Sequence, residues 1–140
     1  MPQKFSLVVT SQVERLAEIA DFIADAACAC GLPDEQIHDV QMAVDEACTN
    51  VIEHAYRGKP DGTIDIVCER RGNEFVVTIQ DFGARFDPKK IESPKTRDPL
   101  SKRRIGGLGL FFMRKLMDRV EFDFTSGRGN RLTMVKKIKP

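Results

Sequence analysis

The sequence predicts an α+β fold, a two-layer α/β sandwich with helices on one face of a mixed, mostly antiparallel sheet. Strand-like and helix-like segments follow one another in the order β-α-α-β-β-loop-α-β-β, and the later strands form two pairs, each joined by a short turn. The chain has 140 residues, of which 41% are hydrophobic, enough for one respectable core. We therefore expect a single domain over residues 1–140.

The first strand and helix are predicted near the N-terminus. The stretch "KFSLVVT" at 4–10 alternates in polarity as a strand does. Ser11 and Glu14 then form an S-x-x-E capping box, which predicts a helix from there to about Cys30.

A second, longer helix is expected after the break "GLP" at 31–33. It runs from about Asp34 to Tyr56, and "RGKPDG" ends it. Its apolar residues recur at helical spacing and predict a buried stripe. The stripe consists of Ile37, Val40, Val44, Ala47 and Val51.

The C-terminal half predicts two hairpins separated by a loop and a helix. "TIDIVCER" and "EFVVTIQ" are joined by Arg71-Gly72-Asn73, a hairpin signal. The loop-like segment 81–107 is long for a small domain, and such loops are usually functional or disordered. "LGLFFMRKLMD" restarts a helix, and "VEFDFTS" and "RLTMVKKIK" close the fold as a second hairpin around "GRGN".

The charge balance excludes some classes of partner. Twenty-two Lys and Arg residues stand against 21 Asp and Glu, for a formal net charge of +1. General nucleic-acid or membrane binders usually carry a strong basic excess, so we expect neither. No stretch approaches the roughly 20 apolar residues of a membrane span, and the N-terminus turns polar too soon for a signal peptide. We expect a cytoplasmic protein.

The cysteines are expected to be free, mostly buried thiols. Cys28, Cys30, Cys48 and Cys68 include no C-x-x-C pair, and the two histidines add no metal spacing to them.

A polar face of the second helix is the first candidate site. Glu46, Asn50 and His54 are spaced by fours and therefore share one face. One interpretation is a solvated helix surface. The other is chemical: an Asn carbonyl suits one position on Mg²⁺, and a carboxylate one turn away can orient or deprotonate an attacking hydroxyl or water.

The stretch "TIQDFGARFDP" is the second candidate. Asp81 ends a predicted strand, so it either starts a turn or accepts a hydrogen bond from an exocyclic amine such as that of adenine. Gly83 would let a flat base approach the backbone. The letters "DFG" also occur in eukaryotic-type protein kinases, but the V-A-I-K and H-R-D motifs of that class are absent from the sequence.

The third candidate is the glycine-rich start of the last helix, Gly106, Gly107 and Gly109. Free backbone N–H groups at a helix start can meet a phosphate, whereas a helix entry made for packing is the alternative interpretation. The preceding loop is basic and could close over a triphosphate as a lid. Its basic residues are Lys89, Lys90, Lys95, Arg97, Lys102, Arg103 and Arg104.

Together, the ordered motifs E-A-x-x-N-x-x-x-H-A-Y, D-x-G-x-x-F-D-P and G-G-x-G-L resemble the GHKL ATPase superfamily and its Bergerat ATP-binding fold. The chain is most similar to the small anti-sigma-factor serine/threonine kinases of the RsbW and SpoIIAB type, over nearly its whole length. The resemblance implies a histidine-kinase-like ATPase domain with an ATP lid at about 84–106.

The resemblance also implies roles for single residues. Asn50 matches the Mg²⁺-binding asparagine, and Glu46 matches the general base. Asp81 matches the aspartate that holds the adenine amine, with Gly83 beside it.

Further roles concern the phosphates. Gly107 and Gly109, followed by Leu110, match the second glycine box, and Arg104 or Arg103 is the expected γ-phosphate contact from the lid. The chain departs from the family pattern at two positions. Arg85 stands where relatives have a glycine, and Asn130 stands where many have a threonine near the adenine.

His54 resembles a common family residue, and we assign it no catalytic role because capping or packing the helix end explains it.

The function implied is an ATP·Mg²⁺-dependent serine/threonine protein kinase that acts as an anti-sigma factor. It would phosphorylate a STAS-type antagonist protein and sequester a sigma factor, as a homodimer paired through the sheet side. One alternative is a non-catalytic module that docks partners according to bound ATP or ADP. Another is a switch kinase that activates a phosphatase.

Overall fold

The computed structural model describes residues 3–87, 107–125, 127 and 129–140. In chain order, the elements are β1 (Lys4–Thr10), a 3₁₀ turn (Val13–Arg15), α1 (Leu16–Ala29), α2 (Asp34–Asn50), a π-helical turn (Val51–Ala55), β2 (Thr63–Arg71), β3 (Glu74–Asp81), α3 (Gly107–Leu116), β4 (Arg119–Asp123) and β5 (Asn130–Lys137).

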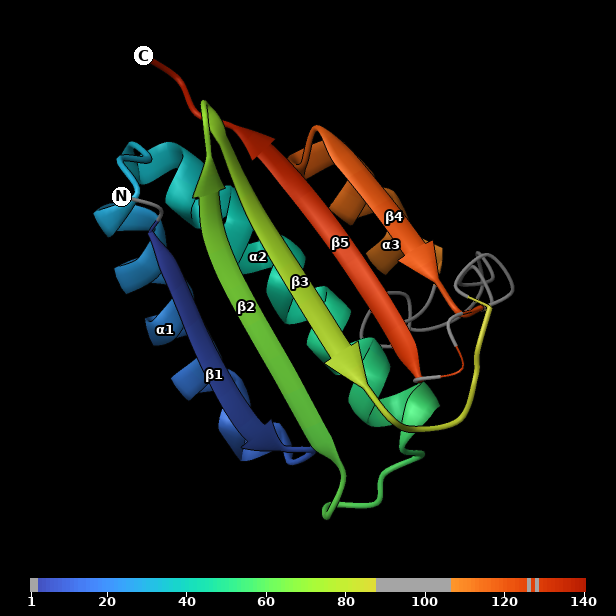
Figure 1. The fold of residues 1–140 in the computed structure, drawn as a ribbon. Coiled ribbons are helices and arrows are strands. Elements are labelled where there is room, and N and C mark those ends of the chain that lie inside the picture. The colour runs from blue at the N-terminus through green and yellow to red at the C-terminus, as the bar shows by residue number, and fades with distance from the viewer. Residues whose placement is uncertain (1–2, 88–106, 126, 128) are drawn as a thin grey trace, which may run out of the picture.

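The helices form one layer and the sheet forms the other (Figure 1). The sheet has five strands in the order β1-β2-β3-β5-β4, and each neighbouring pair is antiparallel. The predicted two-layer α+β class is therefore confirmed. The sheet is antiparallel throughout the described residues, so the parallel pairing that a mixed sheet would contain does not occur there.

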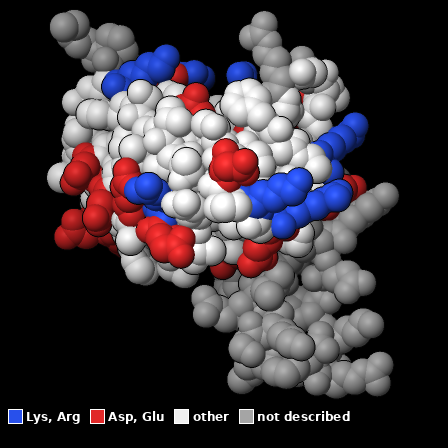
Figure 2. Space-filling view, turned by 90° about the horizontal axis from the view of Figure 1, so that it is seen from below, with Lys and Arg blue, Asp and Glu red and all other residues white. Residues whose placement is uncertain are grey.

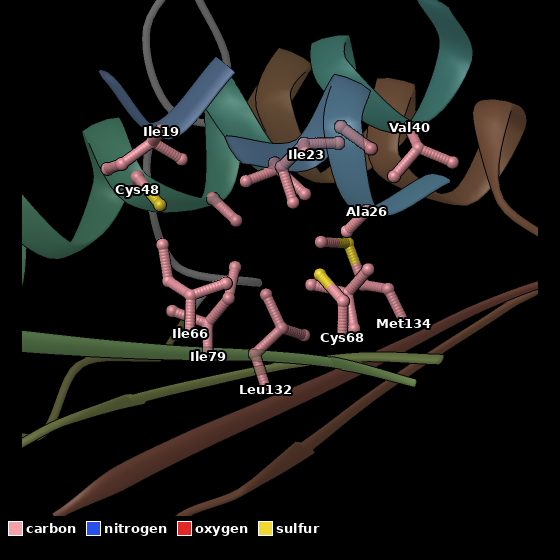
Figure 3. Close-up of a cluster of buried hydrophobic side chains, with 14 of the residues drawn as sticks. Ile19, Ile23, Ala26, Val40, Cys48, Ile66, Cys68, Ile79, Leu132 and Met134 are labelled. Atoms are coloured by element: carbon pink, nitrogen blue, oxygen red, sulfur yellow. The ribbon is translucent and has the colours of Figure 1, made fainter. Parts of the chain in front are cut away.

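The core lies between the two layers (Figure 3). Alternation places Ile64, Ile66 and Cys68 of β2 under the helices, and α1 and α2 cover them with apolar side chains such as Ile23 and Val44. The register of β3 matters most for the site. Its inward residues are apolar until the last, which is Asp81, so a carboxylate occupies a core-facing position.

The first helix begins differently from the prediction. The capping box does not form, because the residue before the 3₁₀ turn is Gln12 and no side chain caps it. Instead, the Ser11 hydroxyl donates to the carbonyl of Lys59 at 2.6 Å and accepts from the N–H of Gly62 at 2.9 Å. The Ser11 hydroxyl, which the local motif predicts as a helix cap, therefore joins the end of β1 to the loop before β2.

The second helix covers the predicted length, but its last turn is π-helical. In the first hairpin only Gly72 has positive φ, as in a type II′ turn.

All four cysteines are free, and three of them are buried, as predicted. Burial raises the pKa of Cys68 to about 12 and that of Cys48 further still, so both thiols stay protonated. No helix in the described part of the chain is long and apolar enough to cross a membrane.

Candidate functional site

The polar face of α2 is partly buried rather than solvated. Asn50 is only 4% exposed, and its side-chain amide has no hydrogen-bond partner among the residues that the structure describes. Glu46 lies one turn earlier, is half-buried and has an interaction partner. The side-chain N and O atoms of Asn50 are not among the fully enclosed unpaired atoms and the residue lines a pocket, so water or a ligand can bond to the amide there.

The π-helical turn directly follows Asn50. The N–H of Tyr56 bonds to the carbonyl of Val51 at 3.0 Å, an i to i−5 bond. At the end of the turn, the carbonyl of Ala55 accepts from the N–H of Ala84 at 2.7 Å. Such turns recur at functional sites because they redirect backbone groups without ending the helix. Here the turn ties the end of the helix to the segment after β3.

His54 lies in this turn and packs against Phe86 there. Its ring centroid is 6.1 Å from that of Phe86. Its Nε2 atom is buried and has no hydrogen-bond partner in the described chain, with the carboxylate of Glu53 3.9 Å away.

Asp81 is a buried carboxylate at the end of β3, with 2% of its surface exposed. Its Oδ1 atom accepts from the N–H of Gly83 at 2.9 Å and from the Asn130 amide at 2.8 Å. Burial raises the pKa of Asp81, and these two hydrogen bonds oppose that rise by stabilising the anion. Its second oxygen, Oδ2, has no partner among the described residues.

Asn130 opens β5 and lies opposite Asp81 in the sheet register. It is 5% exposed, and its Nδ2 donates to Asp81 and, at 3.0 Å, to the carbonyl of Ala84. The preceding Gly129 has φ +85°, and a Cβ there would lie 2.0 Å from the carbonyl oxygen of Asp81. Only glycine permits this approach, so the backbone of the β3 end and the β5 start fit closely together.

Gly83 has a structural reason that the sequence did not reveal. A Cβ at this position would lie 2.5 Å from the carbonyl oxygen of Ala55. Glycine is therefore required at position 83 because the backbone there lies against the π-helical turn. The predicted approach of Gly83 to a base stays a prediction.

Tyr56 connects the helix end to both neighbouring strands. Its hydroxyl accepts from the N–H of Phe82 at 2.8 Å and from that of Thr63 at 3.2 Å, and it donates to the carbonyl of Thr63 at 2.5 Å. The motif contained this tyrosine, but its bridging role depends on chain segments far apart in sequence.

Asn50, Asp81 and Asn130 line one narrow pocket, in which the space open to the centre of a water molecule is about 10 Å³. Asn50, Asp81, Asn130 and Arg131 are its polar lining residues, and the rest of the wall is apolar. The apolar lining residues are Ala47, Val51, Ile79, Phe86, Met113, Phe122, Phe124 and Leu132. A few convergent polar groups in an apolar pocket are typical of a small-molecule site.

Aromatic rings continue the wall toward the sheet edge. Phe86 and Phe124 meet edge to face at 5.9 Å, and Phe122 stacks on Phe124 at 5.8 Å. The guanidinium of Arg85 lies 5.6 Å from the Phe124 ring centroid, so the arginine at the family's glycine position covers an aromatic ring. Neither Phe122 nor Phe124 was singled out in the sequence, because spacing alone does not show which hairpin residues meet the loop after β3.

The phosphate-binding candidates are only partly described. Gly107 begins α3 and Gly109 lies in its first turn, as the sequence predicts, and Leu110 packs against the core. Arg103, Arg104, Gly106 and the rest of the basic loop through residue 106 lie outside the described residues.

The surface at this end carries both signs of charge. Figure 2 views the molecule from below, where β3 ends and β5 begins, and shows basic and acidic side chains interspersed in the described part. The described part of this face therefore shows no broad field of one sign.

Comparison with known proteins connects this geometry to a family. Residues 9–136 match the histidine kinase-like ATPase domain. The chain is 30% identical over 131 residues to the serine-protein kinase RsbW of Listeria innocua, covering 91% of this chain and 83% of that protein. It is 34% identical over 111 residues to RsbW of Bacillus pumilus, covering 75% of this chain and 68% of that protein.

Other relatives extend the match. The anti-sigma F factor of Clostridium novyi is 33% identical over 139 residues, covering 97% of this chain and 94% of that protein. The crystal structure of the RsbU and RsbW domains of Rv1364c from Mycobacterium tuberculosis matches 98% of this chain with a TM-score of 0.70 and 14% identity. This chain spans 33% of that longer one, and the likeness concerns the fold. The chain belongs to the histidine kinase-like ATPase family, alongside the RsbW and anti-sigma F proteins.

Proposed function

We propose that this protein is an ATP·Mg²⁺-dependent serine/threonine protein kinase that acts as an anti-sigma factor. The observation that carries the proposal is the pocket between α2 and the β3–β5 end. There, the unpaired amide of Asn50 and the Asp81–Asn130 pair line the same cavity. Relatives named serine-protein kinase and anti-sigma factor, at 30–34% identity, support the class of reaction.

In the proposed complex the adenine enters the pocket beside Asp81 and Gly83. The phosphates extend past Asn50 toward the start of α3, where Gly107 and Gly109 present backbone N–H groups and Leu110 anchors the turn in the core.

Residues 1–140 would then act as one ATPase domain, with the lid at about 84–106 and its Arg104 closing over the γ-phosphate.

The donor set at Asn50 fits Mg²⁺ in a particular way. The described residues contain no group of three or more His, Cys, Asp or Glu that could hold a metal by themselves. An ion at Asn50 would therefore take its remaining ligands from water and phosphate oxygens, as Mg²⁺ commonly does. It would neutralise charge on the phosphates, while Asn50 fixes their position.

Glu46 is the proposed general base. It lies one helical turn before Asn50 on the same face, so it can accept the proton of a serine hydroxyl aligned with the γ-phosphate. The acceptor oxygen would form a bond to phosphorus as the bond to the ADP oxygen breaks. Most of the acceleration would come from alignment and charge neutralisation.

The proposed partners are a STAS-type antagonist, which receives the phosphate, and a sigma factor, which the protein sequesters. The uncovered face of the sheet is the proposed dimer surface. Val76 and Val135 are paired across β3 and β5, and both are buried although neither belongs to the interlayer core.

The first test is calorimetry of ATP binding with and without Mg²⁺. We expect Mg²⁺-dependent binding by the wild type and a large loss in Asn50→Ala. Asn73→Ala, the same chemical change in the exposed β2–β3 turn, is the matched control and should bind normally. A wild type that ignores ATP would rule out the proposed function.

The second test separates a kinase from a docking module. The protein is incubated with labelled ATP and a candidate STAS-domain protein from the same organism. We expect phosphate on a serine or threonine of the partner, and Glu46→Gln should abolish transfer while keeping ATP affinity. Nucleotide-dependent docking without transfer would instead identify a regulatory module, and capture of a phosphatase in place of a sigma factor would identify a switch kinase.

A further inference from the structure

We propose that Asn130 determines the base specificity of this site, by accepting the second hydrogen of the base's exocyclic amino group while Asp81 accepts the first. The inference rests on the proposed nucleotide function and extends it to a residue at which this chain departs from its family.

The hydrogen bonds of Asn130 set the orientation of its amide. Nδ2 has two hydrogens, and the structure shows two acceptors for them: Asp81 Oδ1 at 2.8 Å and the Ala84 carbonyl at 3.0 Å. Rotating the amide by half a turn would place Oδ1 against these two oxygens, leaving the Ala84 carbonyl without this donor and Asp81 Oδ1 with only the N–H of Gly83. The amide is therefore held with its nitrogen toward Asp81 and Ala84.

This orientation leaves one polar atom of the side chain with unused capacity. Oδ1 of Asn130 has no donor among the described residues, and neither does Oδ2 of Asp81. Both residues line the pocket. That wall therefore offers acceptors, because every donor of the Asp81–Asn130 pair is already used within the protein.

A wall of acceptors selects one class of base. A 6-amino purine has two N–H hydrogens on a single nitrogen and can satisfy both oxygens. A 6-oxo purine would present a carbonyl oxygen to the same two acceptors, leaving all three unpaired in a nearly buried site. Sites built to bond a donor reject analogues that lack it far more strongly than apolar pockets reject size changes.

The pair is also rigid enough to discriminate. Asp81 and Asn130 are 2% and 5% exposed and are opposite each other in the ladder, and Gly129 keeps the two strand ends in contact. A threonine would have a single hydroxyl hydrogen and could not bond to Asp81 and Ala84 at once. Asparagine can donate to the Asp81 carboxylate and to the Ala84 carbonyl at once, and its Oδ1 remains available as an acceptor.

The test compares the affinities of ATP, N6-methyl-ATP and inosine triphosphate by calorimetry in the full chain. In the wild type we expect ATP to bind at least about 100-fold more tightly than inosine triphosphate. In Asn130→Ala the preference for ATP should fall about 10-fold. The preference for ATP over N6-methyl-ATP should fall as well, because the methyl group can occupy the space that the amide leaves.

Two further variants make the result specific. Asn50→Ala, at the phosphate end, should weaken ATP and inosine triphosphate by the same factor and leave their ratio unchanged. Asn130→Thr keeps a polar side chain at this position and serves as a second variant in case Asn130→Ala does not fold. It should also lower the preference for ATP over inosine triphosphate.

The outcomes are distinct. Equal binding of ATP and inosine triphosphate by the wild type, or the same loss for all three nucleotides in Asn130→Ala and Asn130→Thr, would overturn the role of Asn130 and leave the proposed function intact. A wild type that binds none of the three would overturn both.

Discussion

The two sides of the pocket differ in how their polar groups are satisfied. At the β3–β5 end, Asp81 and Asn130 bond to each other and to the backbone at Gly83 and Ala84. On α2, the amide of Asn50 is equally buried and has no partner in the described chain. The strand side is therefore organised before any ligand arrives, whereas the helix side is left for the ligand to complete.

The difference follows from the chemistry proposed for each side. A base is recognised by shape and a few directional hydrogen bonds, which require acceptors fixed in advance. Phosphates and a hydrated cation bring many oxygens of their own. An amide that binds them therefore needs to be correctly placed, but it does not need hydrogen-bond partners within the protein.

The largest predicted effect comes from filling the contact between the two strand ends. Gly129→Ala would place a Cβ 2.0 Å from the carbonyl of Asp81 at a φ of +85°. Overpacking and backbone strain together should lower the free energy of unfolding by about 3 kcal/mol or more in urea titrations. Gly72→Ala is the control: its φ is +62°, but nothing lies within 4 Å, so strain alone should cost about 1 kcal/mol. Equal losses would show that the contact is not tight.

The next effect isolates the carboxylate on the organised side. Asp81→Asn keeps the shape and can still accept from Gly83 and Asn130, but it turns an acceptor toward the pocket into a donor. We expect ATP affinity to fall about 100-fold by calorimetry, with a smaller loss for inosine triphosphate. Unchanged ATP affinity would remove Asp81 from base recognition.

The pH dependence of stability provides a third comparison, with nucleotide absent. Burial raises the folded-state pKa of Asp81 above its unfolded value, so the folded protein binds this proton more tightly and ionisation costs stability. Asp81→Asn should therefore be more stable than the wild type near neutral pH. That gain should shrink as the pH falls through the raised pKa and disappear below the ordinary carboxyl range. A gain independent of pH would contradict this origin.

The smallest effect concerns the connection between the two sides. Tyr56→Phe removes the hydroxyl that joins the helix end to Thr63 and Phe82. We expect a loss of about 1 kcal/mol in unfolding free energy, because the hydroxyl is near solvent and water can replace part of the bonding. Nucleotide affinity should fall only slightly. A large change in base preference would mean that Tyr56 also positions Asp81.

Local pattern was enough for much of the fold. The alternation of 4–10 and 74–80, the helical stripe from Ile37 to Val51 and the Gly72 turn predicted elements that the structure contains within a few residues. The prediction from local pattern was wrong at Ser11. The motif predicts that its hydroxyl caps a helix, but the hydroxyl bonds to the distant loop at Lys59 and Gly62 instead. A short sequence motif predicts only hydrogen bonds between residues that are close in sequence.

What the sequence by itself determined is the order of elements, the family, and the spacing that aligns Glu46 with Asn50, because these depend on periodicity along one chain segment. What only the tertiary structure decided is the pairing of Asp81 with Asn130, the contact of Gly83 with Ala55, and the burial that leaves Asn50 without a partner. Each of these depends on segments that are far apart in sequence and meet only when the sheet register and the helix layer form together.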